Sequence, residues 1–314
     1  MSRRVLITGV TGFIGKWLAD LCLKNGDNVV GIGNWRGVEP IKGIEYKEFF
    51  LEDCGVIDYL HREHFDVVFH LAAQSSIPVS HANPSSTYLA NVMASHNLLR
   101  SIGHSDYVQL ASSSNVYGPV GKEFQPIEET QPLWPTNPYG ISKATMEMIG
   151  LQASLRNDFP VIVSRLFTCT GPRQPKSAAV SSFARQVVRI SKGFQPPVLR
   201  CGNIDNRRTF IDVRDVVSIF YLLSKKDWYG GFHPFNVSGR ESVTLRDIIV
   251  KLGKMSGVKF EVVSESPREG DITLETGNIS KLETKLGTLP LRSLDDTLWD
   301  VYTYWYGQPK EMLE

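Results

Sequence analysis

Near its amino terminus the chain reads Val5-Leu6-Ile7-Thr8-Gly9-Val10-Thr11-Gly12-Phe13-Ile14-Gly15. The apolar start predicts a buried strand over 5–8, and the pattern that follows predicts a helix over 13–25, closed by Gly26. Three glycines, spaced three residues apart, mark the passage from the strand into the helix. Glycine lets the backbone turn sharply and approach a pyrophosphate, which then rests on the free N–H groups of the helix. The stretch predicts a dinucleotide site, with a plain tight turn as the alternative.

The first half of the chain continues this alternation of short apolar runs and amphipathic stretches, which is typical of parallel strands covered by helices. We expect further strands at 28–32, 67–71, 107–111 and 161–165, and further helices at 84–103 and 138–157. These elements predict an α/β fold with a Rossmann-type, doubly wound parallel sheet.

After Cys169 the pattern changes, because turn-forming pairs such as Pro196-Pro197 and Gly230-Gly231 interrupt it. We expect a dinucleotide-binding domain over residues 1–168, to which 208–237 returns. A smaller, discontinuous C-terminal lobe is expected to take 169–207 and 238–314 and to bind the substrate.

The composition excludes several classes of partner. The chain has 34 Lys+Arg against 33 Asp+Glu, so it lacks the basic excess that nucleic acid or an acidic membrane surface would need. Its apolar runs are far shorter than the ~18 residues of a membrane span, and no secretory signal is visible, which favours a cytoplasmic location. The four cysteines have no C-x-x-C pair, so neither a disulfide framework nor a metal site is expected.

The end of the second predicted strand bears on the choice of dinucleotide. It reads Gly33-Asn34-Trp35-Arg36, where an NAD-selective site usually has an acid for the ribose 2′-hydroxyl. Without that carboxylate there is room for a 2′-phosphate, which Asn34 and Arg36 could hydrogen-bond. NADP(H) is therefore favoured, with NAD(H) second. In the alternative interpretation Arg36 is a solvated loop cation.

Two groups of side chains suggest proton chemistry. Tyr139 and Lys143 are four residues apart on a predicted helix, so they share one face. A phenol becomes a useful acid or base near neutral pH when a nearby ammonium stabilises the phenolate. Upstream, Ser112-Ser113-Ser114-Asn115 follows a predicted strand, which places hydroxyls at the carboxyl edge of the sheet where ligands bind. The pattern Tyr-x-x-x-Lys alone often occurs by chance. Here it follows the glycine loop and the serine cluster in the sequence, and this order favours a catalytic site.

Taken together, these motifs resemble one family. Its marks are Thr8-Gly9-x-x-Gly12-Phe13-Ile14-Gly15, His70-Leu71-Ala72-Ala73, Ser112-Ser113-Ser114-x-Val116-Tyr117-Gly118, Pro138-Tyr139-Gly140-x-Ser142-Lys143 and Gly171-Pro172-Arg173-Gln174. They resemble the extended short-chain dehydrogenase/reductases that modify nucleotide sugars. The resemblance implies Ser113, Tyr139 and Lys143 as the catalytic set. It also implies that Arg208 and Arg268 grip the nucleotide diphosphate, although two ordinary surface arginines remain the alternative.

The resemblance also implies two sets of binding residues. Those expected at the cofactor, besides Asn34 and Arg36, are Gly9, Thr11, Gly12, Phe13, Ile14, Gly15, Phe50, Leu51, Leu71, Ala72, Ala73, Asn91, Tyr139, Lys143 and Leu166. Those expected at the substrate, besides Arg208 and Arg268, are Gln74, Ser75, Ser114, Asn115, Thr168, Arg173 and Lys176. Phe50 either stacks on the adenine or packs in the protein.

Three chemistries use this kind of site. A 4,6-dehydratase needs a carboxyl group beside the catalytic hydroxyl, and Asn115 stands there instead. A 4-epimerase holds its dinucleotide tightly and usually selects NAD through the acid that is missing at Gly33. A ketoreductase needs only Ser113, Tyr139, Lys143 and NADPH, so reduction of the 4-keto group of a nucleotide-linked 6-deoxy sugar is the favoured reaction.

A finer resemblance concerns residues 170–177, 183–189 and 202–208, which look most like GDP-sugar reductases that act on 4-keto-6-deoxymannose. GDP is therefore the favoured nucleotide. The epimerase, the dehydratase and a non-catalytic NADP(H)-binding regulator remain as alternatives. The family resemblance also implies a homodimer formed through the predicted helices at 84–103 and 138–157.

Overall fold

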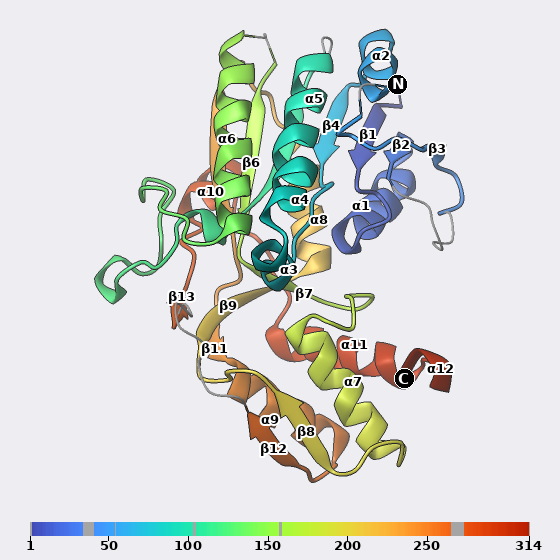
Figure 1. Cartoon of the computed structure of the whole chain (residues 1–314), viewed down its shortest axis with the longest axis vertical. Helices are drawn as coiled ribbons and strands as arrows, with labels where there is room; N and C mark the ends of the chain where they lie inside the picture. The colour runs from blue at the N-terminus through green and yellow to red at the C-terminus, as the bar shows by residue number, and fades with distance from the viewer. Residues whose placement is uncertain are drawn as a thin grey trace.

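The computed structural model describes residues 2–33, 41–53, 55–102, 105–156, 159–264 and 273–313. Its main sheet has seven parallel strands in the order β10-β6-β5-β4-β1-β2-β3 (Figure 1). The strands are β1 (Arg4–Thr8), β2 (Asn28–Ile32), β3 (Glu45–Lys47), β4 (Val67–His70), β5 (Val108–Ser113), β6 (Val161–Leu166) and β10 (Phe232–Val237).

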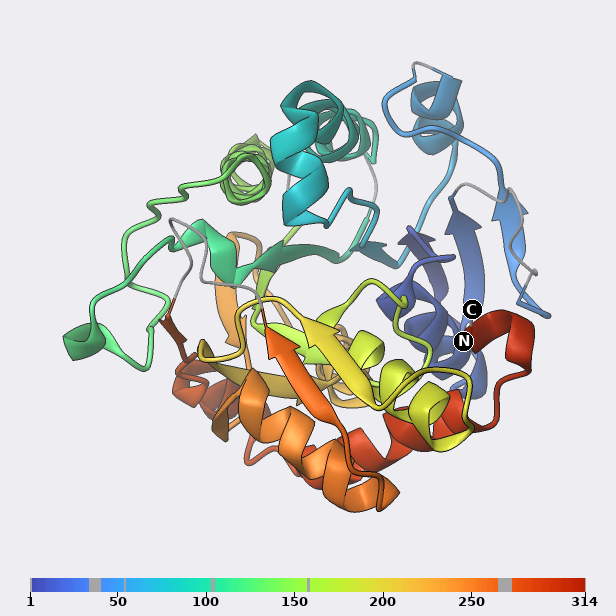
Figure 2. The ribbon, with the colours of Figure 1, turned by 60° about the horizontal axis from the view of Figure 1, so that its bottom comes forward.

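Helices cover both faces of this sheet (Figure 2). One face carries α1 (Phe13–Lys24), α8 (Val213–Leu223) and α10 (Ser280–Leu286). The other carries α2 (Gly55–Arg62), α4 (Pro84–Tyr88), α5 (Ala94–Ser101) and α6 (Pro138–Arg156). A short helix, α3 (Ile77–Ala82), lies at the end of the sheet that faces the remaining elements (Figure 1).

Strand β1 shows why the sheet is buried on both faces. Side chains alternate along a strand, so Val5 and Ile7 enter the core beneath α1 and α8, whereas Leu6 enters the core beneath α2 and α5. All three side chains are fully buried. An uninterrupted apolar run is typical of a parallel strand between two helical layers. The predicted Rossmann-type, doubly wound fold is confirmed.

The predicted elements are found with small differences. The helix expected at 84–103 is divided into α4, one turn of π-helix (Leu89–Met93) and α5. The sequence analysis did not predict β3, α2 or β10. β3 is a three-residue edge strand, and such short elements carry little periodic signal.

A second group of elements lies below the main sheet in Figure 1. It has one sheet of β7 (Thr168–Thr170), β9 (Arg207–Asp212), β11 (Ser242–Thr244) and β13 (Leu274–Glu275), and a pair formed by β8 (Val198–Cys201) and β12 (Glu261–Ser264). Its helices are α7 (Ala179–Ser191), α9 (Leu245–Ser256), α11 (Leu294–Tyr306) and α12 (Lys310–Leu313). Within the segment 208–237, β9 belongs to this group, whereas α8 and β10 pack with the main sheet. The predicted domain boundaries stay a prediction.

The strand order fixes where a ligand can enter. β1 and β4 are neighbours, but the chain builds outward from them in opposite directions. The loops that leave their carboxyl ends therefore part, and this leaves a crevice over Gly9 and Leu71. A doubly wound sheet binds its ligands in such a crevice.

Three structural observations accompany the fold. No helix among the described residues is long and apolar enough to span a membrane. Within the same residues, no group of three or more His, Cys, Asp or Glu side chains is placed to hold a metal ion. Of the described cysteines, Cys22 is buried, and Cys169 and Cys201 are half-buried.

Candidate active site

The glycine loop packs directly against the end of β4. Gly9 has a φ of +69°, and a Cβ there would lie 2.7 Å from the backbone nitrogen of Ala72. A Cβ on Gly15 would lie 2.3 Å from the carbonyl oxygen of Gly9. Both distances are shorter than any real Cβ contact, so only glycine fits at these two positions. The loop thus holds the start of α1 against the crevice.

Two adjoining cavities follow this crevice. The first, of about 290 Å³, lies over the end of β2, and the second, of about 200 Å³, reaches the start of α6. They share Gly9, Gly12, Leu71 and Ala73 and so form one groove. The predicted cofactor residues that line it are Gly9, Thr11, Gly12, Phe13, Ile14, Gly15, Phe50, Leu51, Leu71, Ala72, Ala73, Tyr139, Lys143 and Leu166. Phe49 and Glu52 also line the first cavity, and the sequence analysis missed them.

Of the predicted cofactor residues that the structure describes, Asn91 alone does not line the groove. Asn34 and Arg36 are outside the described residues. Asn91 is buried behind the groove, in the π-helical turn. Its amide pairs with the backbone N–H and carbonyl of Gln74, at 2.7 and 2.9 Å, and donates to the Ser142 hydroxyl at 2.9 Å. Asn91 thereby ties the loop after β4 to α6.

Tyr139 and Lys143 both line the second cavity, as their spacing predicts. The Lys143 ammonium donates to the carbonyl oxygen of Ala111 at 2.7 Å. Burial lowers the pKa of Lys143 to about 8, and the nearby Glu147 carboxylate opposes this shift. Burial raises the pKa of Tyr139, while a hydrogen bond with Ser113 lowers it. At neutral pH the pair therefore holds a phenol proton beside an ammonium.

Ser113 ends β5 next to this pair. Its side-chain oxygen accepts hydrogen bonds from the backbone N–H and the side-chain amide of Asn115, each at 3.2 Å. The Asn115 side-chain oxygen in turn accepts from the amide of Asn137 at 3.3 Å. Ser113, Tyr139 and Lys143 are thus brought together from two elements, β5 and α6.

A buried ion pair lies beneath the site, and the sequence analysis missed it. Glu147, one turn after Lys143, is fully buried and accepts from the guanidinium of Arg165, with the shortest distance 2.8 Å. It also accepts a hydrogen bond from the Ser112 hydroxyl. Arg165 donates further to the Tyr117 hydroxyl at 3.0 Å. The i, i+4 spacing of Lys143 and Glu147 is the sequence signal that could have indicated this residue.

His70 belongs to the motif that follows β4, and the family resemblance implies no role for it. Its imidazole nitrogens lie 2.8 Å from the hydroxyl oxygens of Thr8 and Ser95, so it joins β1 to α5. Burial lowers the pKa of His70 to about 3, and the Lys143 charge adds to the shift. His70 is therefore neutral, and its role in this structure is to fix the ends of the central strands.

This neutral histidine predicts acid sensitivity. Between pH 6.5 and 3 the unfolded chain takes up a proton at His70, whereas the folded protein does not. The free energy of unfolding should therefore decrease as the pH falls through this window, by up to ~1.4 kcal/mol per pH unit from His70 alone. Urea unfolding at several pH values gives the free energy of unfolding as a function of pH. This free energy should depend less steeply on pH in His70→Asn than in the unchanged protein. Equal slopes would contradict the prediction.

A larger cavity, of about 540 Å³, lies where Pro78 of α3 faces the second group of elements. Two predicted substrate residues, Thr168 and Arg208, line this cavity. Thr168 is only two residues after Leu166, which lines the groove. Arg208 lies 3.5 Å from the carboxylate of Glu275. The sequence analysis missed the other polar lining residues, which include Gln174, Arg200, Asn203 and Asn206.

The remaining predicted substrate residues are spread out. Ser75 lines the second cavity of the groove, whereas Ser114 is buried and Gln74 hydrogen-bonds the Thr87 hydroxyl. Lys176 is exposed and lines none of the described cavities. Arg268 lies outside the described residues.

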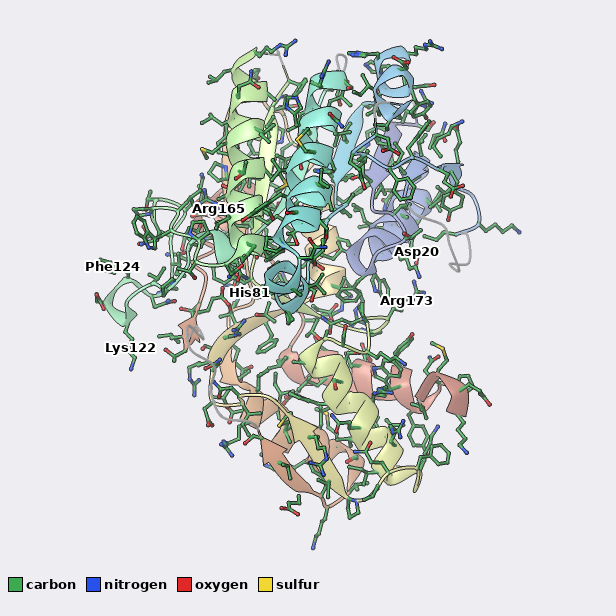
Figure 3. The ribbon with its side chains drawn as sticks, viewed as in Figure 1. Asp20, His81, Lys122, Phe124, Arg165 and Arg173 are labelled. Atoms are coloured by element: carbon green, nitrogen blue, oxygen red, sulfur yellow. The ribbon has the colours of Figure 1, made fainter. Side chains whose placement is uncertain are left out.

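Arg173 is held by α1 (Figure 3). Its guanidinium lies 2.9 Å from the carboxylate of Asp20 and 4.5 Å from the centre of the Trp17 ring. The indole N–H of Trp17 donates to the carbonyl of Pro172 at 3.1 Å. Arg173 therefore links the segment after β7 to α1, and it does not line the large cavity.

A glycine loop at the switch point, with a tyrosine and a lysine on one helix face beside it, is the arrangement of the short-chain dehydrogenase/reductases. The chain belongs to the extended enzymes of this class that act on nucleotide sugars, and the family model described as GDP-mannose 4,6 dehydratase matches residues 6–300. The predicted family resemblance is confirmed.

The relatives cover nearly all of the chain. It is 30% identical to the GDP-6-deoxy-D-mannose reductase of Pseudomonas aeruginosa over 316 residues, which cover 99% of this chain and 100% of the relative. A structure of RMD from Pseudomonas aeruginosa complexed with NADPH is 29% identical, with a TM-score of 0.85 over 97% of this chain and 99% of that one. The structure of the UDP-glucose 4-epimerase of Thermotoga maritima is 27% identical, with a TM-score of 0.87 over 99% of this chain and 100% of that one.

Proposed function

We propose that this protein reduces the 4-keto group of a nucleotide-linked 6-deoxy sugar, with NADPH as reductant and GDP as the nucleotide. The single observation that carries the proposal is the cavity shared by Tyr139 and Lys143, with Ser113 hydrogen-bonded to the phenol and an amide, Asn115, where a dehydratase would need an acid. The named reductase among the relatives supports the same reaction.

Each polar group of the site has a part in this reduction. When a nicotinamide dinucleotide is held in the groove, it would be the source of the hydride for the ketone carbon. Tyr139 gives its phenol proton to the ketone oxygen, while Ser113 donates a hydrogen bond that holds this oxygen in place. The Lys143 ammonium, fixed on the Ala111 carbonyl at 2.7 Å, stabilises the phenolate that remains.

The groove suits a dinucleotide. The groove runs along the crevice from Phe50 and Leu51 at one end to Tyr139 at the other. The glycine loop lies between these two ends and would bind the pyrophosphate. NADP(H) is proposed because no acid follows β2 at positions 33–36. The carboxylate of Glu52 lines the same cavity and makes NAD(H) the second candidate. Affinities for NADPH and NADH, measured by fluorescence titration, decide between them.

The large cavity would hold the nucleotide of the substrate. Its 540 Å³ is within the ordinary range for a small-molecule site, and Arg208 supplies a guanidinium suited to phosphate oxygens. Binding there uses a part of the substrate that does not react, so it can position the sugar in the groove without changing the chemistry.

The direct test is to mix the purified protein with NADPH and enzymatically prepared GDP-4-keto-6-deoxymannose. Absorbance at 340 nm should fall in proportion to the deoxysugar formed. UDP- and dTDP-linked 4-keto sugars provide the comparison for the nucleotide. Absence of NADPH consumption with all of them would remove the proposal.

A 4-epimerase is the second candidate, favoured by the TM-score of 0.87 to the Thermotoga maritima enzyme. An epimerase returns the hydride to its own intermediate and keeps the dinucleotide bound. Denaturing the purified protein and identifying any released nicotinamide separates the two. Stoichiometric NAD with interconversion of UDP-sugars would favour the epimerase.

A homodimer is also proposed, through the outer face of α6 and the neighbouring α4–α5 segment. Ile141, Met148 and Leu155 recur every seven residues on α6, and each is at least 40% exposed in the single chain. Leu89 and Met93 add exposed apolar surface on the π-helical turn. Such a stripe, left in water, favours pairing with a second copy.

Leu155→Glu should shift this dimer to a monomer, because Leu155 is 79% exposed in the single chain and has no core contact to lose. The expected result is a halved mass by light scattering coupled to size exclusion. Val250→Glu, at a half-exposed residue on α9, is the matched control and should keep the mass unchanged. A monomeric parent protein, or a dimeric Leu155→Glu variant, would contradict the prediction.

A further inference from the structure

Three side chains and one backbone group form a continuous chain of hydrogen bonds that ends at the site. The Gly140 N–H donates to the Asn137 side-chain oxygen at 2.8 Å. The Asn137 amide donates to the Asn115 oxygen at 3.3 Å, and the Asn115 amide donates to the Ser113 oxygen at 3.2 Å. This chain runs from the start of α6 to the end of β5.

The first donor determines the direction of every later bond. A backbone N–H can only donate, so the oxygen of Asn137 must face Gly140 and its amide nitrogen must face Asn115. The same reasoning then turns the Asn115 oxygen toward Asn137 and its nitrogen toward Ser113. Each asparagine has one accepting and one donating end, so neither can be reversed alone without bringing like ends together.

The direction of these bonds determines whether the Ser113 hydroxyl donates or accepts. Its oxygen has two acceptor positions, and the backbone N–H and side-chain amide of Asn115 occupy both at 3.2 Å. The hydroxyl proton is therefore left to donate, and the group it meets is the Tyr139 phenol. A reacting sugar oxygen that enters beside the phenol would receive the same proton as a hydrogen bond.

We propose that Asn137 and Asn115 are positioning residues that act as a one-way relay and make Ser113 a hydrogen-bond donor to the reacting oxygen. The inference rests on the proposed reduction for its effect on turnover, but its effect on Tyr139 does not depend on any substrate. A donor at this place stabilises the negative charge that develops on the ketone oxygen as the hydride arrives. An acceptor there would repel it.

Asn137→Asp tests the relay without touching Ser113. A carboxylate still accepts the Gly140 N–H and remains a good residue before a helix, so the fold should be unaffected. It cannot donate, however, so the Asn115 amide must turn its nitrogen toward the introduced carboxylate and its oxygen toward Ser113. The Ser113 proton is then drawn to Asn115 and away from the phenol.

With NADPH and the 4-keto sugar, Asn137→Asp should lower kcat at pH 7.5 by roughly 10²–10³-fold, the range for one lost donor to a developing oxyanion. KM for the nucleotide sugar should change less than twofold, because the nucleotide cavity is untouched. Asn115→Asp, which places a carboxylate against Ser113 itself, should lower kcat at least as much. Asn83→Asp is the matched control, since Asn83 caps α4 in the same way outside the site.

The substrate-free measurement is the titration of Tyr139. In protein with ¹³Cζ-labelled tyrosine, the Tyr139 resonance is assigned with Tyr139→Phe and followed against pH. Loss of the Ser113 donor should raise the pKa of Tyr139 in Asn137→Asp and Asn115→Asp relative to the unchanged protein and Asn83→Asp. The rise should be larger than the one that the same substitutions cause in a Ser113→Ala background, where only the introduced charge acts on the phenol. If the pKa rises but no 4-keto sugar is reduced, the relay stands and the proposed function fails. An unchanged pKa, or an unchanged kcat in a protein that reduces the sugar, would overturn the relay.

Discussion

Tyr139→Phe is expected to lower kcat for reduction of the 4-keto sugar by roughly 10²–10⁴-fold, the usual contribution of a positioned proton donor. The phenyl ring fills the same space on α6 but carries no proton for the ketone oxygen. Because the glycine loop and the first cavity are unchanged, NADP(H) affinity should stay within about twofold. Steady-state kinetics and fluorescence titration of the dinucleotide measure the two quantities separately.

Tyr229→Phe is the matched control for this prediction. Tyr229 is 98% exposed, so removal of its hydroxyl alters no packed group. Its kcat should equal that of the parent protein. Retention of more than a tenth of the parental kcat by Tyr139→Phe would assign proton transfer to another group.

Arg165→Met is expected to reduce the free energy of unfolding by about 3–5 kcal/mol, the cost of leaving one partner of a buried ion pair without its counter-charge. Glu147 is fully buried, and Arg165 supplies its guanidinium partner at 2.8 Å. Methionine nearly fills the volume of the arginine stem but leaves the carboxylate in an apolar surrounding. Guanidinium chloride unfolding at pH 7 gives the change directly.

Arg246→Met provides the comparison. Arg246 and Asp205 also form a 2.8 Å ion pair, but both side chains are more than half exposed. An exposed pair of this kind contributes only about 0–1 kcal/mol. The double variant Arg165→Met/Glu147→Gln should recover part of the lost stability, because the amide carries no charge to desolvate. An equal decrease in the free energy of unfolding for Arg165→Met and Arg246→Met would show that the buried pair contributes no more to stability than the exposed one.

Much of the groove could be predicted because its signals are local. Gly9 and Gly12 lie between β1 and α1, and Gly15 lies in the first turn of α1, so the turn they form needs no distant information. Tyr139 and Lys143 share a face because 3.6 residues make one helical turn. Both predictions depend on dihedral angles that neighbouring residues set, and the structure places all of these residues along one groove.

The polar partners could not be predicted in the same way. Nothing near Arg173 in sequence indicates Asp20, which is 153 residues away, and the motif suggested a substrate contact instead. Glu147 could be noticed from its spacing to Lys143, but its partner Arg165 comes from the neighbouring strand. Asn91 illustrates the same point, because its amide holds the Gln74 backbone and Ser142 on two other segments.

The sequence by itself determined the alternation of strands and helices, the glycine turn and the face that carries Tyr139 and Lys143, because backbone geometry and side-chain periodicity act over a few residues. Only the tertiary structure decided which polar group satisfies which other, as in the bonds from Asn137 through Asn115 to Ser113. A hydrogen bond forms or fails over a few tenths of an ångström, and that distance is set by how separate segments pack against one another.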